Sequence, residues 1–283
     1  MAFAMAIFGT ISLFVKNIPL PSGEMVLYRA LLACGVITLI LLVRKQPVNW
    51  PQVKKELPLL LISGVVVGVN WLLLFLAYNY TSVSVATLSY YFAPVIVTLA
   101  APVLFKEKLT KKQILCFVMS TLGLVLVIGV SGFGQGSSDL TGILFGLGAA
   151  VLYATVILLN KFIKGVAGIQ RTFLQFLAAI LILIPYVAST SGVTLGGMDA
   201  AGWACLLVVG LVHTGIAYCL YFSALKEIPG QEAAILSYID PLVAVVISVT
   251  VLGEGISLAQ IVGGTLILGF TLWNEVKTEK RTA

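Results

Sequence analysis

The stretch YYFAPVIVTLAAPVLFKE (Tyr90–Glu107) returns in altered form as SYIDPLVAVVISVTVLGE (Ser237–Glu254), 147 residues later. Both copies hold a tyrosine, a proline three residues after it and a glutamate near the end. Sliding residues 63–114 onto 210–261 gives 11 identical pairs among 52 positions. The shared Tyr, Pro, Glu and Gln are the informative matches, because these residue types are scarce in so apolar a chain. A duplicated hydrophobic half is typical of secondary transporters, which hold one substrate site between two repeats.

The composition indicates that lipid is the solvent for most of the chain. Of its 283 residues, 60% are hydrophobic and only 10% are charged, and the mean hydropathy is +1.09. Soluble domains carry about 25% charged residues. The net charge of +6 does not indicate nucleic-acid binding, because the charges occur in short clusters between apolar runs and form no basic stripe.

The sequence predicts neither a metal site nor a cofactor. Its four cysteines lie inside apolar runs and lack the spacing of metal ligands, so we interpret them as packing residues. No motif resembles a phosphate-binding loop, so an ion or solute gradient must supply the energy for any transport. The four cysteines are Cys34, Cys116, Cys205 and Cys219.

Apolar runs bounded by charges, prolines and glycines predict an all-α integral membrane protein with ten transmembrane helices. Most runs are about 20 residues long, the length that crosses a bilayer as a helix. Each must be helical, because lipid offers no partner to an unpaired backbone amide. The first run lacks the basic start of a signal peptide and is not interpreted as one. It is short for a span, so we expect the true start to lie upstream of Met1. The predicted segments are 1–16, 23–43, 57–79, 83–105, 112–130, 140–161, 169–188, 200–222, 230–252 and 256–275.

The distribution of Lys and Arg predicts the orientation. Alternating the ten segments places fifteen cations on one side and only Lys16 on the other, with Arg29 inside a segment. Cytoplasmic loops carry such an excess, so we expect a multi-pass protein of the cell membrane with both termini in the cytoplasm. The fifteen are Arg44, Lys45, Lys54, Lys55, Lys106, Lys108, Lys111, Lys112, Lys161, Lys164, Arg171, Lys226, Lys277, Lys280 and Arg281.

Five is an odd number of spans, so the second half enters the membrane in the opposite direction to the first. The predicted organisation is a first five-helix repeat over residues 1–130, an external linker rich in Gly and Ser over 131–139, a second repeat over 140–275 and a cytoplasmic tail over 276–283. Such inverted repeats are related by a pseudo-twofold axis in the membrane plane.

At this point the chain resembles the EamA family of the drug/metabolite transporter superfamily. The resemblance rests on the two quoted stretches, on their place in ten segments and on Arg29 early in the second segment. It implies that helices of both halves line one central cavity, with segments 112–130 and 256–275 more peripheral. Family members move amino acids, amines, sugars, nucleotide precursors and drugs. The family often has Glu where this chain has Asp240.

Asp240 and His213 are the sharpest candidates for chemistry. Asp240 lies about ten residues into its segment, which is about 15 Å deep. A carboxylate there either binds a cation or proton or, when protonated, joins helices by hydrogen bonds. His213 is predicted at similar depth and is either a proton-relay partner of Asp240 or a packing residue. In the first half the equivalent positions hold Ala93 and Val66, so this pair breaks the repeat.

A set of aromatic and amide side chains is the candidate substrate wall. Thr87, Tyr90 or Tyr91, Pro94 and Thr98 recur at helical spacing and form a polar stripe. Such residues line a cavity for a small organic solute or collect at helix interfaces. Tyr221 is also a candidate belt aromatic at the membrane surface. The full set is Asn70, Trp71, Tyr90, Tyr91, Tyr153, Asn160, Tyr218, Tyr221 and Tyr238.

Four further features have two interpretations each. Arg29 either holds an anionic substrate group or extends to the interface. Pro94 and Pro241 are expected to kink their helices, for function or for shape. Glu107 and Glu254 are expected to cap helices or form ion pairs at span ends. Glycine pairs at four-residue spacing, at 64/68 and 142/146, predict close helix contacts.

The sequence therefore predicts a secondary transporter that moves a small organic metabolite by alternating access. An amino acid, an amine or a drug-like solute is the expected cargo, efflux the expected direction and protons the candidate coupling ion. The partners are this solute, protons and the lipid bilayer, and the protein is a monomer or homodimer. The alternatives are an integral-membrane enzyme, a lipid-precursor flippase or a channel. The sequence contains neither a recognisable pair of nucleophile and base nor a filter loop, so it favours a transporter over an enzyme or a channel.

Overall fold

The computed structural model describes residues 1–43, 45, 50–105, 110–132, 137–166, 168–224, 227 and 236–276. Within these ranges the chain is helical and contains no strand. Several predicted features lie outside the described residues. These are Glu107, the cations Arg44, Lys106, Lys108 and Lys226, the linker residues 133–136 and the tail residues 277–283.

Every predicted segment coincides with helix, in part or in full. Several segments are divided into consecutive helices, and α4 begins seven residues before the segment predicted for it. The helices are α1 (Ala2–Gly9), α2 (Ile11–Val15), α3 (Ser22–Val43), α4 (Trp50–Tyr80), α5 (Val83–Tyr90), α6 (Ala93–Phe105), α7 (Lys111–Gly132), α8 (Ser137–Phe162), α9 (Gly168–Thr190), η1 (Leu195–Gly197), α10 (Ala200–Leu207), η2 (Val208–Ile216), α11 (Ala217–Ala224), α13 (Ile239–Thr250) and α14 (Leu258–Glu275).

Six helical stretches of the described chain are long and apolar enough to cross a membrane. They are Ser22–Val43, Trp50–Tyr80, Val83–Ala100, Asp139–Phe162, Gly168–Thr190 and Ala200–Ala224. Shorter apolar helices cover Ala2–Val15, Ile239–Thr250 and Leu258–Asn274. Large apolar side chains such as Leu144 and Leu181 are exposed on the outside of the helices, as expected when lipid is the solvent. The all-helical prediction is confirmed, whereas the count of ten spans stays a prediction.

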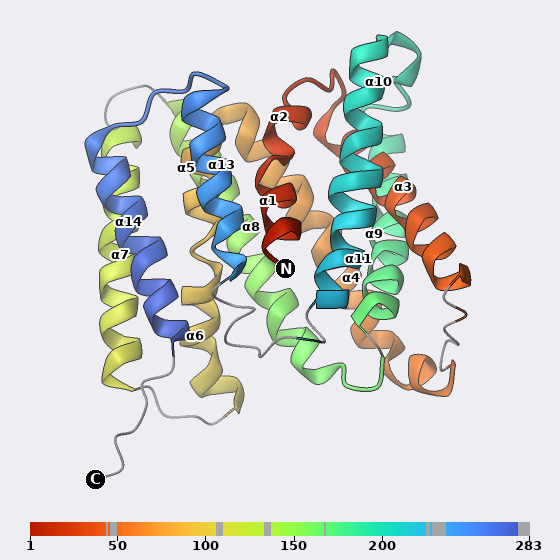
Figure 1. Ribbon diagram of the computed structural model, residues 1–283, viewed down its shortest axis with the longest axis horizontal. Helices are drawn as coiled ribbons and strands as arrows, with labels where there is room; N and C mark the ends of the chain where they lie inside the picture. Colours follow the sequence, from red (N-terminus) through yellow and green to blue (C-terminus); the bar gives the residue numbers. More distant parts are fainter. Residues whose placement is uncertain are drawn as a thin grey trace.

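The helices form a central group and a peripheral pair (Figure 1). In the centre, α4 packs against α8 and α9, and α3 packs against α9 and η2. At one edge, α7 and α14 pack against each other, as the resemblance implied for segments 112–130 and 256–275. The N-terminus lies in the middle of the molecule, at the start of α1 (Figure 1).

Two glycines on α4 bring this helix close to α9. A Cβ on Gly64 would lie 2.5 Å from the Cβ of Ala178 and from the carbonyl oxygen of Gln175. A Cβ on Gly68 would lie 3.1 Å from the Cβ of Ala179. Only residues without a side chain allow helices to approach so closely. This contact brings the polar faces of α4 and α9 to one side of the molecule's interior.

Two spans are interrupted rather than kinked at their prolines. The helix α5 ends at Tyr90 and α6 begins at Ala93, so that Pro94 is the second residue of α6. Tyr238 lies in a turn before α13, and Pro241 is the third residue of that helix. Proline is tolerated in the first turn of a helix because its missing N–H would have no partner there. The predicted kinks are therefore breaks, at positions 147 residues apart.

The segment predicted as one continuous helix over 200–222 contains a π-helical stretch, η2, between α10 and α11. Two side chains in it contact backbone carbonyls five residues earlier in the chain. The Thr214 hydroxyl donates to the Val209 carbonyl at 2.8 Å, and His213 Nδ1 lies 3.2 Å from the Val208 carbonyl oxygen. π-helical turns occur frequently at functional sites.

Candidate functional site

A cavity of about 520 Å³ lies among the central helices. Its wall combines residues of α1, α2, α3, α4, α5, α6, α8, α9, α11 and α13, whereas α7 and α14 contribute none of the lining residues. Pockets that bind small molecules typically measure about 300–1,000 Å³. The cavity is therefore large enough for one small organic molecule.

Most of the candidate residues from the sequence line this cavity. Of the ten candidate binding or coupling residues, only His213 is missing from the wall. The polar stripe Thr87, Tyr90, Tyr91, Pro94 and Thr98 lies entirely on it, whereas Pro241 does not. The lining candidates are Asp240, Tyr90, Tyr91, Tyr238, Asn70, Trp71, Tyr153, Tyr218 and Arg29, joined by Asn160 and Tyr221.

Asp240 is the acidic residue among the described residues of the cavity wall. The Tyr91 hydroxyl donates a hydrogen bond to Asp240 Oδ2 at 2.6 Å. The break between α5 and α6 presents Tyr91, and the first turn of α13 presents Asp240. A carboxylate at a helix N-terminus is stabilised by the helix dipole. The hydrogen bond thus joins the two halves of the chain at their repeated breaks.

Aromatic rings form much of the remaining wall. Tyr90 stacks on Tyr153 with ring centroids 5.2 Å apart and meets Tyr91 edge to face. On the other side, Phe176 lies edge to face with Trp71 and with Tyr218, at 4.8 and 5.4 Å. Such rings offer apolar faces to a ligand together with a few hydroxyl groups.

Arg29 is buried in the wall rather than extended to the surface. It is 4% exposed, and its guanidinium carbon lies 4.2 Å from the ring centroid of Trp71 and 4.9 Å from that of Phe75. Its Nε donates to Thr214 Oγ1 at 3.1 Å. Burying an ion costs several kcal/mol, and a cation–π contact returns only about 0.5–2 kcal/mol. The two rings alone therefore do not compensate the buried charge.

Arg171 is a cavity residue that sequence reasoning missed. It was counted only as one of the fifteen cations of the cytoplasmic side, yet it lies in the first turn of α9 and lines the cavity. Its Nη1 makes only long contacts of 3.4 Å to the carbonyls of Asn160 and Ile163. Its position four residues before Gln175 places both on one helix face, a signal that could have revealed it.

Amide side chains join the helices that form the cavity floor. Gln175 Nε2 donates to Ser63 Oγ and to Asn160 Oδ1, each at 2.8 Å. Asn70 Nδ2 donates to the carbonyl of Ala149 at 2.6 Å. These bonds connect α4, α8 and α9, so that Asn70 and Asn160 hold the wall together besides lining it.

His213 lies outside the cavity, and no hydrogen bond joins it to Asp240. Its Nε2 lies 2.9 Å from Thr10 Oγ1, and its ring is 5.0 Å from that of Phe14. Residues at the junction of α1 and α2 separate the two candidates. Gly9, next to Thr10, approaches the Asp240 carbonyl so closely that a Cβ there would lie 2.6 Å from that oxygen. His213 therefore contacts Thr10 and Phe14, as a packing residue would, and does not contact Asp240 directly.

A polar latch, formed by Lys16, Glu254, Val83, Ser84 and Ser248, joins three helix ends. Lys16 forms an ion pair with Glu254, whose other oxygen accepts the Val83 N–H at 2.8 Å. That same oxygen accepts the Ser248 hydroxyl, and Ser84 Oγ donates to Ser248 Oγ at 2.8 Å. Glu254 thus both caps the start of α5 and forms an ion pair, the two roles expected from its position.

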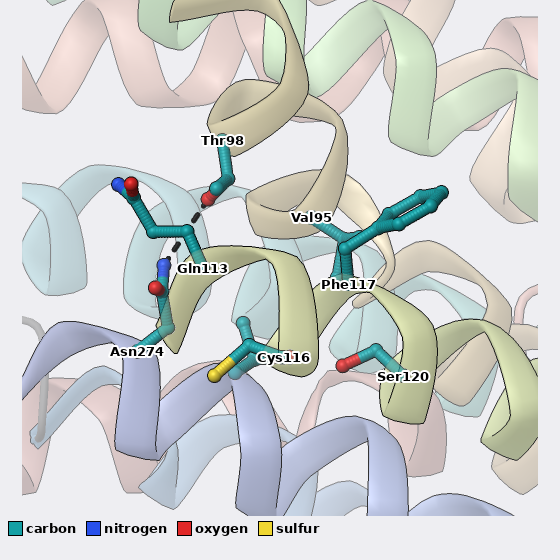
Figure 2. Close-up of a pocket in the computed structure, with 8 residues that line it drawn as sticks. Val95, Thr98, Gln113, Cys116, Phe117, Ser120 and Asn274 are labelled. Carbon is teal, nitrogen blue, oxygen red and sulfur yellow. Dashed lines mark hydrogen bonds between the residues drawn. The ribbon is translucent and has the colours of Figure 1, made fainter. Parts of the chain in front are cut away.

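A second pocket between α6, α7 and α14 is too small for a solute. Its volume is about 10 Å³, about the room of one water. Figure 2 shows Asn274 of α14 donating to Thr98 Oγ1, at 3.1 Å. Thr98 also lines the large cavity, so the peripheral helix α14 orients one hydroxyl of its wall.

Comparisons with known proteins agree with this architecture. The EamA-like transporter family matches residues 1–129 and 140–274. The chain is 31% identical over 272 residues to the uncharacterized transporter YxxF of Bacillus subtilis, covering 94% of this chain and 85% of YxxF. It is 27% identical to the protein PecM of Dickeya dadantii, covering 94% and 87%.

A solved crystal structure shares the fold at 17% identity, with a TM-score of 0.65, covering 95% of this chain and 93% of that one. The family and the names of its members indicate a membrane transporter rather than an enzyme. The cavity among its apolar helices is the feature that such a protein requires for a solute. The chain belongs to the EamA-like transporter family.

Proposed function

We propose that this protein is a secondary transporter that carries a small organic solute across the cell membrane by alternating access. The observation that carries this proposal is the cavity of about 520 Å³ with Asp240 and Tyr91 joined across its wall. Amino acids, amines and drug-like solutes fit its size and aromatic lining. Efflux is the proposed direction, and protons are the proposed coupling ion.

The proposed topology has ten spans in two inverted five-helix repeats, with both termini in the cytoplasm. The domain boundaries are residues 1–130 and 140–275, joined by the external linker 131–139 and followed by the tail 276–283. The family matches two separate stretches with nearly these limits, which supports the division. The helix breaks at Tyr91 and Tyr238, 147 residues apart, support the repeat. The positive-inside rule supports the orientation.

Alternating access requires that the cavity close toward one side while it opens toward the other. In the proposed orientation the latch around Glu254 lies on the external side, because Lys16 does. Its bonds join α2, α5 and α13, three elements that surround the cavity. We propose that opening toward the outside breaks these bonds.

Asp240 is the proposed coupling group. As a carboxylate it accepts the hydrogen bond from the Tyr91 hydroxyl, and when protonated it has no charge to hold a cation. The other titratable groups of the described cavity wall are the guanidinium groups of Arg29 and Arg171 and the hydroxyls of Tyr78, Tyr90, Tyr91, Tyr153, Tyr218, Tyr221 and Tyr238. Exchange of a proton at this position would change the charge that the solute meets.

The test is transport by purified protein in liposomes under an imposed pH gradient, with a panel of labelled amino acids, amines and organic acids. Wild type is expected to move at least one solute faster when the gradient is present. Asp240→Asn is expected to lose the dependence on the gradient, and Asp139→Asn, which removes a carboxylate outside the cavity, to keep it. Movement of no solute would contradict transport, and an unchanged pH dependence in Asp240→Asn would contradict coupling through this residue.

Closure by the latch has its own test. A single cysteine placed at Thr87, in a variant without the four native cysteines, reports access to the cavity through its reaction with a membrane-impermeant thiol reagent. Glu254→Gln removes the charge that holds Lys16 and is expected to accelerate external labelling several-fold. Glu227→Gln, at an exposed turn, is the control. Equal labelling rates in the two variants would exclude the latch as an external closure.

A further inference from the structure

We infer that the solute of this cavity carries a carboxylate or a comparable organic anion on an apolar body, and that Arg29 binds the anionic group. This inference rests on the proposed transport function and narrows its solute class. It excludes simple amines, which are among the solutes expected from the sequence.

The balance of charge on the wall is the first observation. Two guanidinium groups, Arg29 and Arg171, line the cavity, against one carboxylate, Asp240. Guanidinium groups keep their charge in proteins. The described wall therefore carries a net charge of +1 when Asp240 is ionised and +2 when it is protonated. A solute with an anionic group would neutralise this excess, and a cationic solute would increase it.

The geometry of Arg29 is the second observation. Its Nε donates to Thr214, and its guanidinium carbon lies 4.2 Å from the ring centroid of Trp71 and 4.9 Å from that of Phe75. Its two terminal nitrogens make no hydrogen bond within the described part of the chain, and no carboxylate there lies within ion-pair distance of it. A planar guanidinium held in this way offers two parallel donors, the arrangement that matches a carboxylate.

The π-helical segment η2 explains why Arg29 is held in one orientation. Its Thr214 accepts from Arg29 Nε and donates to the Val209 carbonyl, so the hydroxyl is fixed from both sides. Thr214 itself is fully buried. This support restricts the guanidinium before any ligand arrives, which lowers the entropic cost of binding.

Arg171 offers a second position for the anion, at the other end of the cavity. Arg29 lies near the start of α3, which is joined to the end of α4 by the bond from Asn79 to Ser22. Arg171 lies near the start of α9 and contacts the carbonyl of Ile163. The next two residues of the chain donate their N–H groups to Glu56, in the second turn of α4. The two guanidinium groups therefore lie toward opposite ends of α4, and an anion crossing the cavity would meet both.

The aromatic rings supply the site for the apolar body. Trp71, Phe176 and Tyr218 form a continuous edge-to-face series beside Arg29. A flat or aliphatic group can pack on these rings while its anionic group faces the guanidinium.

The experiment measures binding to purified protein in lipid nanodiscs without any gradient. Three probes share one ring and differ in head group: phenylacetate is an anion, phenylacetamide is neutral and phenethylamine is a cation. Titration of each against the melting temperature gives its affinity, because a ligand of the folded state stabilises it by mass action. Wild type is expected to bind phenylacetate at least about tenfold more tightly than the other two.

Substitutions assign this preference to Arg29. Arg29→Gln is expected to bind phenylacetate and phenylacetamide alike. Arg29→Lys keeps the charge but not the fork, and is expected to retain a weakened preference. Lys55→Gln, which removes an exposed cation outside the cavity, is the control and should match wild type. Melting of each variant without ligand shows that it is folded.

Three results would overturn the inference: equal or tighter binding of the amide or the amine by wild type, an anion preference retained in Arg29→Gln, or stabilisation by none of the probes. The proposed function fails separately. If phenylacetate binds through Arg29 but no solute crosses the liposome membrane, transport falls and the anion site stands. If the liposomes move amines but not organic acids, the anion site falls and transport stands.

Discussion

His213 and Asp240 lie in neighbouring spans at depths that the sequence could not distinguish, yet they occupy different environments. Asp240 is half-buried on α13 and faces the cavity, where its partner is the Tyr91 hydroxyl. His213 is 2% exposed on η2 and faces the junction of α1 and α2, where its partner is Thr10. Depth along a span therefore does not determine the side to which a residue points.

The two positions differ in whether the side chain can contact solute or water in the cavity. A group on the wall can meet a solute or water, and a change in its charge alters what the cavity binds. A group between packed helices meets only fixed neighbours, and its substitution affects chiefly the free energy of unfolding. Substitutions can separate these two behaviours, because a wall residue affects transport and a packed residue affects stability.

The largest effect is expected for Asp240→Asn, at least about a tenfold loss of transport rate. If the two residues act independently, the transport rate of the double variant His213→Ala/Asp240→Asn, relative to wild type, should equal the product of the relative rates of the two single variants. The coupling free energy from this cycle should stay below about 0.5 kcal/mol. A larger coupling, measured by initial rates in liposomes, would restore the proton relay between the two residues.

An intermediate effect is expected for Tyr91→Phe. The change removes the hydroxyl that donates to Asp240 and leaves the ring in place. A hydrogen bond to a charged group contributes about 1.5–3 kcal/mol, so a loss of about tenfold in transport or a shift of its pH dependence is expected. Tyr186→Phe, near the end of α9, is the matched control. Identical pH profiles for wild type and Tyr91→Phe would show that Asp240 does not need this donor.

His213→Ala is expected to change stability rather than transport. It removes the contacts to Thr10 and Phe14 and lowers the free energy of unfolding by about 1–3 kcal/mol. Initial transport rates per folded molecule should stay within about twofold of wild type. Melting in nanodiscs and liposome transport measure the two quantities on the same preparation. Loss of transport without loss of stability would place His213 in the mechanism.

The smallest effect is expected for Thr10→Val, which keeps the shape of the side chain and removes the partner of His213. Its hydroxyl also donates to the Ile7 carbonyl at 2.8 Å, a bond that backbone neighbours can replace. A loss of about 1 kcal/mol in unfolding free energy is expected, and less in the His213→Ala background than in wild type. Additive losses in the double variant would show that the two side chains do not interact.

Much of the site could be predicted because its residue types are conspicuous in an apolar chain. Asp240, Arg29 and the tyrosines of the polar stripe were identified from depth and helical spacing, and all line the cavity. Arg171 was missed because near the end of a span a cation also fits a loop. The direction in which His213 points could not be predicted, because the spacing of residues does not reveal a π-helical turn, which changes the directions of side chains on the helix.

The sequence alone was sufficient to predict that lipid is the solvent, which segments are helical and that prolines distort two of them. These properties are local, because each helix satisfies its own backbone hydrogen bonds and each proline acts on its own turn. Which helix faces pack against each other depends on the tertiary structure. It brought Arg29 and Asp240 to one cavity and turned His213 away, since those outcomes depend on close packing between helices far apart in the chain, such as α4 against α9 at Gly64.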